Sequence, residues 1–482
     1  MRSSFGGLEI AKRGIFTQQA ALTTAGHNVA NANTRGYSRQ SVNMVAARPI
    51  EALGLQRSTV PGQMGQGVEF TEVKRIRESF LDKQYANENK SLGEWSVRQD
   101  TLEKLEAIIN EPSDTGMRQV LDNFWNSWQE LSKQPDNLET RAVVKESALA
   151  VTDAFNHAAK QLNDLASDLN DSISVKVSQV NSTLKQIAGL NNEIFRVEGL
   201  GNNANDLRDQ RDVLIDDLSR VINVSVQEEP NGYHVRMGGV DLVVGATATD
   251  FTEDVARGAY PTDLNSGELS GLILSNDKYV TEYKNQLNSM VSTLVSAVND
   301  MHKQGYTLQS PPTNGGDFFV PITDFSIAAE TMAVSTNITN NVENIAASMK
   351  TYTDPTDGVV KVVKGNNELA LKIADIKNQK YNFDGSGVEK VILNGGTFDE
   401  FLRAVVSEIG VQTQEATRQT QNQQILVDQV DARRQSTSGV SLDEEMADMI
   451  KYQHAYNAAA RALTTFDEML DKVINSMGVV GR

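Results

Sequence analysis

The feature that most constrains the fold is a long stretch of chain without a helix breaker. Residues 141–188 contain no glycine or proline, and their apolar side chains recur at steps of three and four, the spacing of one face of an α-helix. At 1.5 Å per residue such a helix extends roughly 70 Å, which favours an elongated rod of long helices over a compact globule. The stripe consists of Val144, Ala148, Val151, Phe155, Ala158, Leu162, Leu165, Leu169, Ile173, Val177, Val180, Leu184 and Ile187.

Each end of the chain carries a further apolar stripe at heptad spacing. Because a lone helix would leave such a stripe in water, we expect the N- and C-terminal helices to pair as a coiled coil and their remaining apolar surface to meet other subunits. The first stripe is Phe5, Leu8, Ile15, Leu22 and Val29. The second begins at a capping box, Ser441–Glu444, and is Leu442, Met446, Met449, Gln453, Tyr456, Ala460, Leu463, Asp467, Leu470, Ile474 and Met477.

The remaining patterns add other helices and a small amount of β structure. Helical spacing predicts helices over 95–111, 275–302 and 397–434. The last begins at a capping box, and its stripe is Leu402, Val405, Ile409, Ala416, Leu426 and Val430. Alternating apolar residues predict a hairpin within 221–245, with a turn at Asn231-Gly232, and short strands at 359–363 and 388–393. The fold class is therefore mainly α with a smaller β-rich insertion.

Composition excludes several classes of protein. The chain has 45 lysines and arginines against 63 aspartates and glutamates, a formal net charge of −18, which argues against a nucleic-acid binder or a polybasic membrane anchor. It has no cysteine, so disulfides and thiolate metal sites are excluded. Without an apolar run of about 18 residues or a signal-peptide pattern, we expect a protein that is cytoplasmic or exported without a cleaved leader.

No pattern predicts an active site, a cofactor or a metal. The five histidines are far apart in sequence, and the HExxH, GxxxxGK[ST] and GxSxG motifs are absent. We interpret the acidic residues of 443–448 as helix capping and those of 206–212 as a solvated helix face, with Arg208 and Asp212 paired four residues apart. Leu121, Phe124, Trp125 and Trp128 lie at helical spacing, which predicts core packing against the long helix.

The segment directly after the first helix is unusual. Residues 28–40, Asn-Val-Ala-Asn-Ala-Asn-Thr-Arg-Gly-Tyr-Ser-Arg-Gln, are dense in asparagine, glycine and small side chains. Such amides and hydroxyls suit a turn that hydrogen-bonds to itself and to its neighbours.

These residues resemble the N-terminal signature of the bacterial flagellar axial family, the rod, hook and junction proteins, in which a helix is followed by approximately NxANxxTxGY. The Ser38–Gln40 extension is most similar to the hook-associated junction proteins. Residues 438–445, 452–461 and 467–471 resemble the C-terminal segment of the same proteins, and 205–212 and 266–272 resemble their internal stretches. The likeness therefore covers the whole chain. The modest β-rich portion is a departure, because family members often carry a larger outer insertion.

The resemblance implies a structural role without catalysis. It implies a junction adaptor that joins hook to filament and is needed for filament assembly and motility. The protein would leave the cytoplasm unfolded through the flagellar type III apparatus. It would form a ring with copies of itself, contact hook subunits and the second junction protein, and be held before export by a chaperone on its C-terminal helix. The expected assembly residues are Asn31, Thr34, Gly36 and Tyr37 of the signature, Phe5, Leu8, Ile15, Leu22 and Val29 of the first stripe, and Leu442, Met446, Met449, Gln453, Tyr456, Leu463, Leu470 and Ile474 of the second.

Three parts are expected. They are a terminal domain of residues 1–45 and 438–482, a helical domain of 46–220 and 265–437 with a small β region near 355–395, and an outer insertion at 221–264. Two alternatives stay open. One is another axial flagellar protein, either the second junction protein or a hook subunit. The other is a secreted enzyme domain on a flagellar stem, for which only residues 221–393 offer room.

Overall fold

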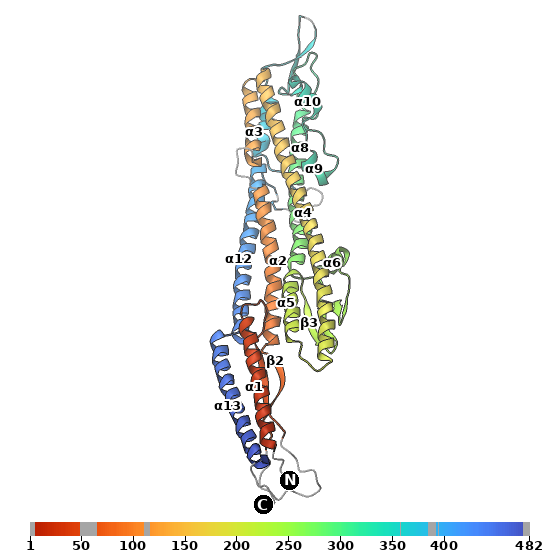
Figure 1. Cartoon of the computed structure of the whole chain (residues 1–482). Coiled ribbons are helices and arrows are strands. Elements are labelled where there is room, and N and C mark those ends of the chain that lie inside the picture. The colour runs from red at the N-terminus through yellow and green to blue at the C-terminus, as the bar shows by residue number, and fades with distance from the viewer. Residues whose placement is uncertain are drawn as a thin grey trace, which may run out of the picture. The chain divides into compact units, whose positions relative to one another are not determined.

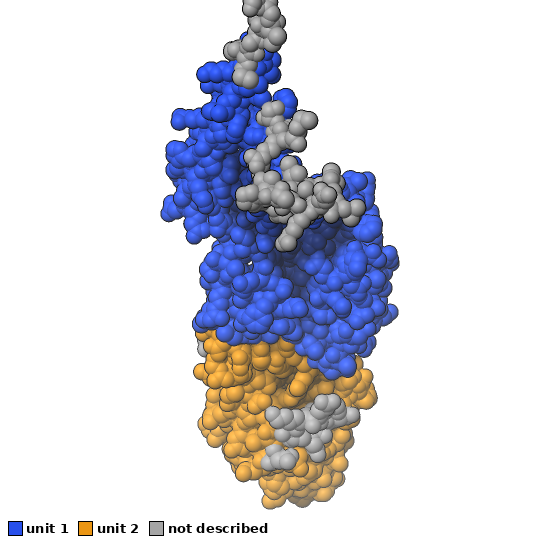
Figure 2. All heavy atoms as spheres, turned by 90° about the horizontal axis from the view of Figure 1, so that it is seen from below, with its two compact units in different colours: residues 1–92, 177–267, 423–482 blue, residues 93–176, 268–422 orange. Residues whose placement is uncertain are grey.

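The computed structural model describes residues 5–48, 65–109, 116–356, 358–383, 392–393 and 395–475. The chain divides into two compact units, coloured separately in Figure 2. Unit 1 contains residues 1–92, 177–267 and 423–482, and unit 2 contains residues 93–176 and 268–422. Both units are mainly helical, as the sequence predicts.

Long helices dominate the chain (Figure 1). They are α1 (Gly6–Ala30), α2 (Ser79–Ile109), α3 (Met117–Lys133), α4 (Leu138–Glu198), α5 (Asn205–Val221), α8 (Thr281–His302), α12 (Phe398–Ser438) and α13 (Leu442–Asn475). Shorter ones are α6 (Glu253–Ala259), α7 (Glu268–Leu274), α9 (Ala328–Thr331), α10 (Thr336–Asn340) and α11 (Glu368–Asp375). The helices expected over 141–188, 275–302 and 397–434 are confirmed. The one expected over 95–111 begins earlier, at Ser79, as α2.

The apolar stripe of α4 is buried along its whole predicted length. Every member from Val144 to Ile187 is at most 7% exposed. In α12 the stripe holds from Leu402 to Ala416, but near its end Val427 is buried and Leu426 is 41% exposed. The capping box that begins α12 is confirmed, because the Thr397 amide donates to Glu400 Oε2 at 2.9 Å and the Glu400 amide to Thr397 Oγ1 at 3.2 Å.

The β structure is antiparallel and confined to small sheets. Strands β3 (Ser225–Glu229), β4 (Gly232–Met237), β5 (Val240–Val244) and β6 (Thr247–Ala248) form a four-stranded sheet in chain order. The predicted hairpin is confirmed as β3–β4, in which Glu229 pairs with Gly232, so the turn lies one residue earlier than expected. β7 (Thr351–Thr353) pairs with β8 (Val360–Val362), confirming the strand expected near 359–363. Residues 388–391 of the other expected strand lie outside the described residues, and 392–393 are not extended strand.

The sequence did not predict one sheet. β1 (Gln40–Ala46) pairs antiparallel with β2 (Val68–Arg75), from Gln40 opposite Arg75 to Ala46 opposite Val68. This two-stranded sheet directly follows the signature segment and contacts α1 through the Thr17 hydroxyl, which donates to the Val68 carbonyl at 3.5 Å.

Unit 2 has an aromatic core. The ring centre of Phe124 lies 6.0–6.3 Å from those of Trp128, Phe318 and Phe319, and that of Trp128 lies 5.4 Å from Phe318. All four side chains are fully buried. The predicted burial of Leu121, Phe124, Trp125 and Trp128 is therefore confirmed. Their printed ring partners come from the segment after α8 and from the start of α12, where Trp125 lies near Phe398.

The terminal helices α1 and α13 lie side by side in unit 1 (Figure 1). They run antiparallel, because Gly7 faces Phe466, Gly14 faces Ala459, and Asn28 bonds to Glu445. The predicted pairing of the two ends of the chain is confirmed.

Candidate assembly site

The contact between α1 and α13 is closed by small and polar side chains. The buried residues of α1 are Ala11, Thr17, Ala21, Ala25 and Asn28. Along the described length of α13 the only buried residue is Glu445. A Cβ built on Gly14 would meet the Cβ of Ala459 at 3.4 Å, and one on Gly7 would meet the Phe466 ring at 2.4 Å. The helices therefore approach closely where side chains are absent or small.

The large apolar residues of the predicted stripes lie beside this contact rather than at its centre. None of the predicted stripe residues that the structure describes is buried, and Met477 lies outside the described residues. Half-buried members are Leu8, Ile15, Leu22, Val29, Met449, Tyr456, Leu463 and Leu470, and exposed members are Phe5, Leu442, Met446, Gln453 and Ile474. Phe5, Leu8, Leu470 and Ile474 line one hollow where the start of α1 meets the end of α13.

The signature residues predicted for assembly bond mainly within unit 1. Asn31 caps the end of α1 by donating from its side chain to the His27 carbonyl at 3.0 Å, and Thr34 donates to Asn31 Oδ1 at 3.2 Å. Tyr37 donates its hydroxyl to Asn28 Oδ1 at 2.7 Å. Gly36 has φ +77°, and a Cβ there would meet Val213 of α5 at 2.0 Å, so the turn presses against that helix at a position only glycine fits.

Residues 38–40 connect this turn to α5. The Ser38 amide donates to Asp209 Oδ2 at 2.8 Å. Gln40 donates from Nε2 to Asp206 Oδ1 at 2.7 Å and accepts from Asn205 at 3.2 Å. The signature is therefore bound along the first half of α5.

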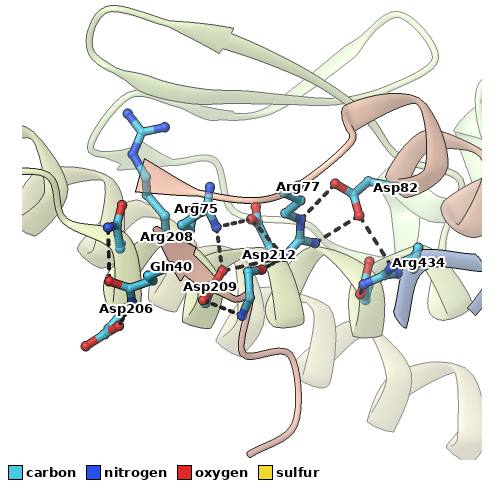
Figure 3. A network of polar contacts seen from close by, with 12 residues as sticks. Gln40, Arg75, Arg77, Asp82, Asp206, Arg208, Asp209, Asp212 and Arg434 are labelled. Carbon is cyan, nitrogen blue, oxygen red and sulfur yellow. Dashed lines mark hydrogen bonds and ion pairs between the residues drawn. The ribbon is translucent and has the colours of Figure 1, made fainter. Parts of the chain in front are cut away.

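A buried network of charges holds β2 on the same helix (Figure 3). Arg75 Nη1 lies 2.6 Å from Asp209 Oδ1 and 2.8 Å from Asp212 Oδ2, and Arg77 Nη1 lies 3.3 Å from Asp212 Oδ2. Arg77 also pairs with Asp82, at 2.8 Å between Nε and Oδ2. These side chains are mostly shielded from water, so their charges are stabilised by one another.

The network continues to α12. Arg434 Nη2 lies 2.8 Å from Asp216 Oδ2, and Arg434 Nε lies 3.4 Å from Asp82 Oδ1. Aspartates at three- and four-residue steps along α5 thus meet arginines from separate segments. In Figure 3 Arg75 and Arg77 lie beside Asp209 and Asp212, and Arg434 lies beside Asp82.

The carboxylates of this network titrate differently. Burial opposes ionisation of Asp212, but the Arg77 and Arg75 guanidiniums outweigh it and hold the pKa of Asp212 below its ordinary value. Burial raises the pKa of Asp209. Burial also raises the pKa of Asp216 to about 6, and Arg434 only partly offsets it. The arginines therefore keep Asp212 ionised, whereas Asp216, one turn later on α5, has a raised pKa and takes up a proton at a higher pH.

Two interpretations of acidic segments need correction. Arg208 does not pair with Asp212 but lies 2.6 Å from Glu198 Oε1 and 2.7 Å from Glu228 Oε1, because α5 turns Asp212 inward to Arg75. The acidic start of α13 is also more than a solvated cap. Arg39 lies 2.6 Å from Glu445 Oε1, 2.9 Å from Glu444 Oε2 and 3.5 Å from Asp448 Oδ2.

Sequence reasoning missed the residues that connect the termini to α5. The resemblance covers Ser38, Arg39 and Gln40 without giving them partners, Glu445 is interpreted as helix capping, and no sequence pattern singles out Arg75 or Arg77. Arg75 ends β2 and Arg77 follows two residues later, a spacing that puts both side chains on one side of an extended segment. No local signal pairs them with aspartates more than a hundred residues away.

In the part of the chain that the structure describes, this arrangement is accompanied by neither a metal-binding group of side chains nor a membrane-spanning helix. Among the described residues, no group of three or more His, Asp or Glu side chains is arranged to hold a metal ion. Within the same ranges, no helix has the length and apolar character needed to cross a bilayer.

The chain is similar to known proteins in sequence and in fold. The family model described as flagellar hook-associated protein FlgK helical domain matches residues 102–319. The one described as flagellar basal body rod FlgEFG protein C-terminal matches residues 431–477. Flagellar hook-associated protein 1 of Bacillus subtilis (strain 168) is 34% identical over 532 residues and covers 100% of both chains.

A second relative and a solved structure are similar to the chain at lower sequence identity. Flagellar hook-associated protein 1 of Escherichia coli (strain K12) is 26% identical, over 96% of this chain and 98% of its own. The structure of the flagellar hook junction protein FlgK from Burkholderia pseudomallei matches with a TM-score of 0.60 at 14% identity, over 73% of this chain and 100% of that chain. This last likeness shows a common fold.

Proposed function

The chain belongs to the family of flagellar hook-associated protein 1, and we propose that it joins its neighbours through the outward faces of α1 and α13. It is a structural component of the bacterial flagellum, located at the hook–filament junction. Membership of this family decides against a hook subunit, the second junction protein and a secreted enzyme.

The observation that carries the proposal is the distribution of side chains in the pair formed by α1 and α13. The buried positions of its contact are small or polar, whereas its large apolar side chains are half-buried or exposed. The exposed ones are Phe5 before α1, Ile10 and Phe16 of α1, and Leu442, Met446, Ile450, Met469, Val473 and Ile474 of α13. So many exposed apolar side chains along one helix pair suit a site that another protein covers.

The neighbours are inferred from the family and from this surface. We expect copies of the same chain, arranged as a ring, to cover part of it, and hook subunits and the second junction protein to cover the rest. We expect the predicted stripe residues, from Phe5 to Val29 and from Leu442 to Ile474, to contribute to this surface. Before export through the type III apparatus, a cytoplasmic chaperone on α13 would shield the same side chains from water.

The domain division follows from the same reasoning. The terminal pair supports a terminal assembly domain of residues 1–45 and 438–482, and the four-stranded sheet lies within the proposed outer insertion, 221–264. Residues 46–220 and 265–437 form the proposed helical domain.

The test is a charge placed on the exposed apolar face. Ile450 is 55% exposed, so Ile450→Asp should leave the purified chain folded by circular dichroism. In cells that lack the native copy, the variant should be exported and yet fail to support filaments and motility, because a desolvated carboxylate is costly in an interface.

The matched control is His157→Asp, which adds the same charge at an exposed histidine of α4 in unit 2. It should support filaments normally. A normal filament on the Ile450→Asp chain would contradict the proposed surface, and equal loss in both variants would mean that the added charge, rather than its place on the apolar face, decides assembly.

A further inference from the structure

The small residues of α1 do not by themselves fix the register of the pair, that is, which residues of α13 lie opposite which residues of α1. Gly7, Gly14 and Ala21 recur every seven residues on the face turned to α13. A slide of one heptad would move Phe466 from Gly7 to Gly14, and Ala459 from Gly14 to Ala21. Each large or small side chain of α13 would again meet a small one, so packing in the two registers is nearly equivalent.

One position breaks this repetition. The next residue of the series on α1 is Asn28, which is 1% exposed, and its partner Glu445 is 3% exposed. Asn28 Nδ2 donates to Glu445 Oε2 at 3.0 Å, and Arg39 Nε donates to Glu445 Oε1 at 2.6 Å. Both carboxylate oxygens are therefore satisfied in this register.

The partners of Glu445 are themselves fixed. Asn28 also donates to the Gln40 carbonyl at 2.9 Å, and its Oδ1 accepts from the Gln40 amide at 3.0 Å and from the Tyr37 hydroxyl at 2.7 Å. The Arg39 amide donates to the Ser438 carbonyl at 2.8 Å. These bonds thus hold Asn28 and Arg39 in position to bind one carboxylate at the start of α13.

We propose that Asn28, Arg39 and Glu445 form a register lock that selects one alignment of the two terminal helices. A slide of one heptad in one direction would place Glu445 against Ala21, and a slide in the other would carry it past Asn28. Either slide leaves a carboxylate, an amide and a guanidinium without these partners, which is strongly unfavourable for buried groups. The lock thus specifies alignment, whereas the small residues supply the close contact. This inference does not depend on the flagellar role.

Disulfide trapping in the purified full-length chain measures the register directly, because the chain has no cysteine of its own. Gly14→Cys with Ala459→Cys reports the native register, since their Cβ atoms would lie 3.4 Å apart, close to disulfide geometry. Ala21→Cys with Ala459→Cys, and Gly14→Cys with Tyr452→Cys, report the two slides of one heptad.

With Glu445 present, the native pair should form its disulfide at least about tenfold faster than either slid pair, a preference of about 1.4 kcal/mol. In a Glu445→Leu background the rates should converge to within about threefold, and the thermal midpoint should fall, because Asn28 and Arg39 lose a buried partner. A role in stability alone would lower the midpoint and leave the preference for the native pair unchanged.

Glu444→Leu is the matched control. Glu444 also bonds Arg39, but its side chain is 64% exposed, so its loss should keep the native preference. Glu445→Gln, which keeps the shape, provides a second variant if Glu445→Leu does not fold. An unchanged preference in a folded Glu445 variant, or no preference in the chain that retains Glu445, would overturn the lock.

Discussion

The aromatic core of unit 2 and the terminal helix pair of unit 1 are built in opposite ways. In the core, Phe124, Trp128, Phe318 and Phe319 are fully buried. In the pair, the buried positions are small or polar, and Phe16, Ile450 and Val473 are more than half exposed. The core is complete within one chain, whereas the pair leaves its large apolar surface for something else to cover. Burial of apolar area therefore stabilises the core within one chain, and it contributes less to the contact between α1 and α13.

The largest expected effect comes from cutting into the core. Phe318→Ala should lower the free energy of unfolding of unit 2 by about 3–5 kcal/mol, because it removes a buried ring and leaves a cavity. The three tryptophans, Trp95, Trp125 and Trp128, all lie in unit 2, so urea unfolding followed by their fluorescence reports this unit. A loss below about 1 kcal/mol would mean that the core repacks freely.

Acid should weaken the same core. His302 accepts from the Ala346 amide at 2.8 Å and contacts the Gly316 carbonyl at 2.7 Å, and burial lowers its pKa from 6.5 to about 4. The unfolded chain therefore binds the proton first, and stability falls as the pH drops from about 6.5 to 4, by about 3 kcal/mol. Tryptophan-detected urea unfolding measures this slope. His157→Gln, at an exposed histidine, should keep it, and a flat profile would contradict the prediction.

Unit 1 should show the reverse dependence through Asp216. Burial raises its pKa to about 6 from 3.8, so the folded state holds the proton more tightly, and this contribution is lost as the pH rises from about 4 to 6. Relative to Asp216→Asn, the wild-type chain should lose about 2–3 kcal/mol over that window. Hydrogen exchange of the α5 amides at several pH values is the measurement. Parallel profiles for the two chains would show that Asp216 does not titrate in this range.

The smallest effect is expected on the outside of the pair. Phe16 is 55% exposed, so Phe16→Ala should change the stability of the monomer by no more than about 0.5 kcal/mol. The thermal midpoint of the purified chain tests this. A loss comparable to that of Phe318→Ala would mean that the ring is covered within the chain, and the contrast between the two regions would disappear.

Periodicity predicted the buried face of α4 better than the contact between the terminal helices. The stripe of α4 was predicted residue by residue, because a long uninterrupted pattern admits one buried face. The same reasoning found the terminal helices but chose their large apolar residues as the seam, whereas Ala11, Ala21 and Ala25 of α1 form the contact. Small residues give a weak hydrophobic signal, and periodicity does not tell which partner covers a stripe.

The ion pairs and hydrogen bonds of Asp209, Asp212 and Glu445 could not be predicted from the sequence for a different reason. Asp209 and Asp212 read as a solvated face because their partners, Arg75 and Arg77, are far away in the chain and carry no mark of the pairing. The alternation in β1, at Val42 and Met44, was present, but the partner strand lies beyond an intervening segment. Glu445 likewise read as helix capping, since nothing local distinguishes it from Glu444.

Cysteine accessibility at position 450 tests the central claim most directly. In a chain that otherwise lacks cysteine, Ile450→Cys should react rapidly with a soluble maleimide in the purified monomer, and at least about tenfold more slowly in intact flagella, where neighbours cover the outward face of α13. Equal reactivity in the two states would show that this face remains open to water after assembly, and would contradict the account.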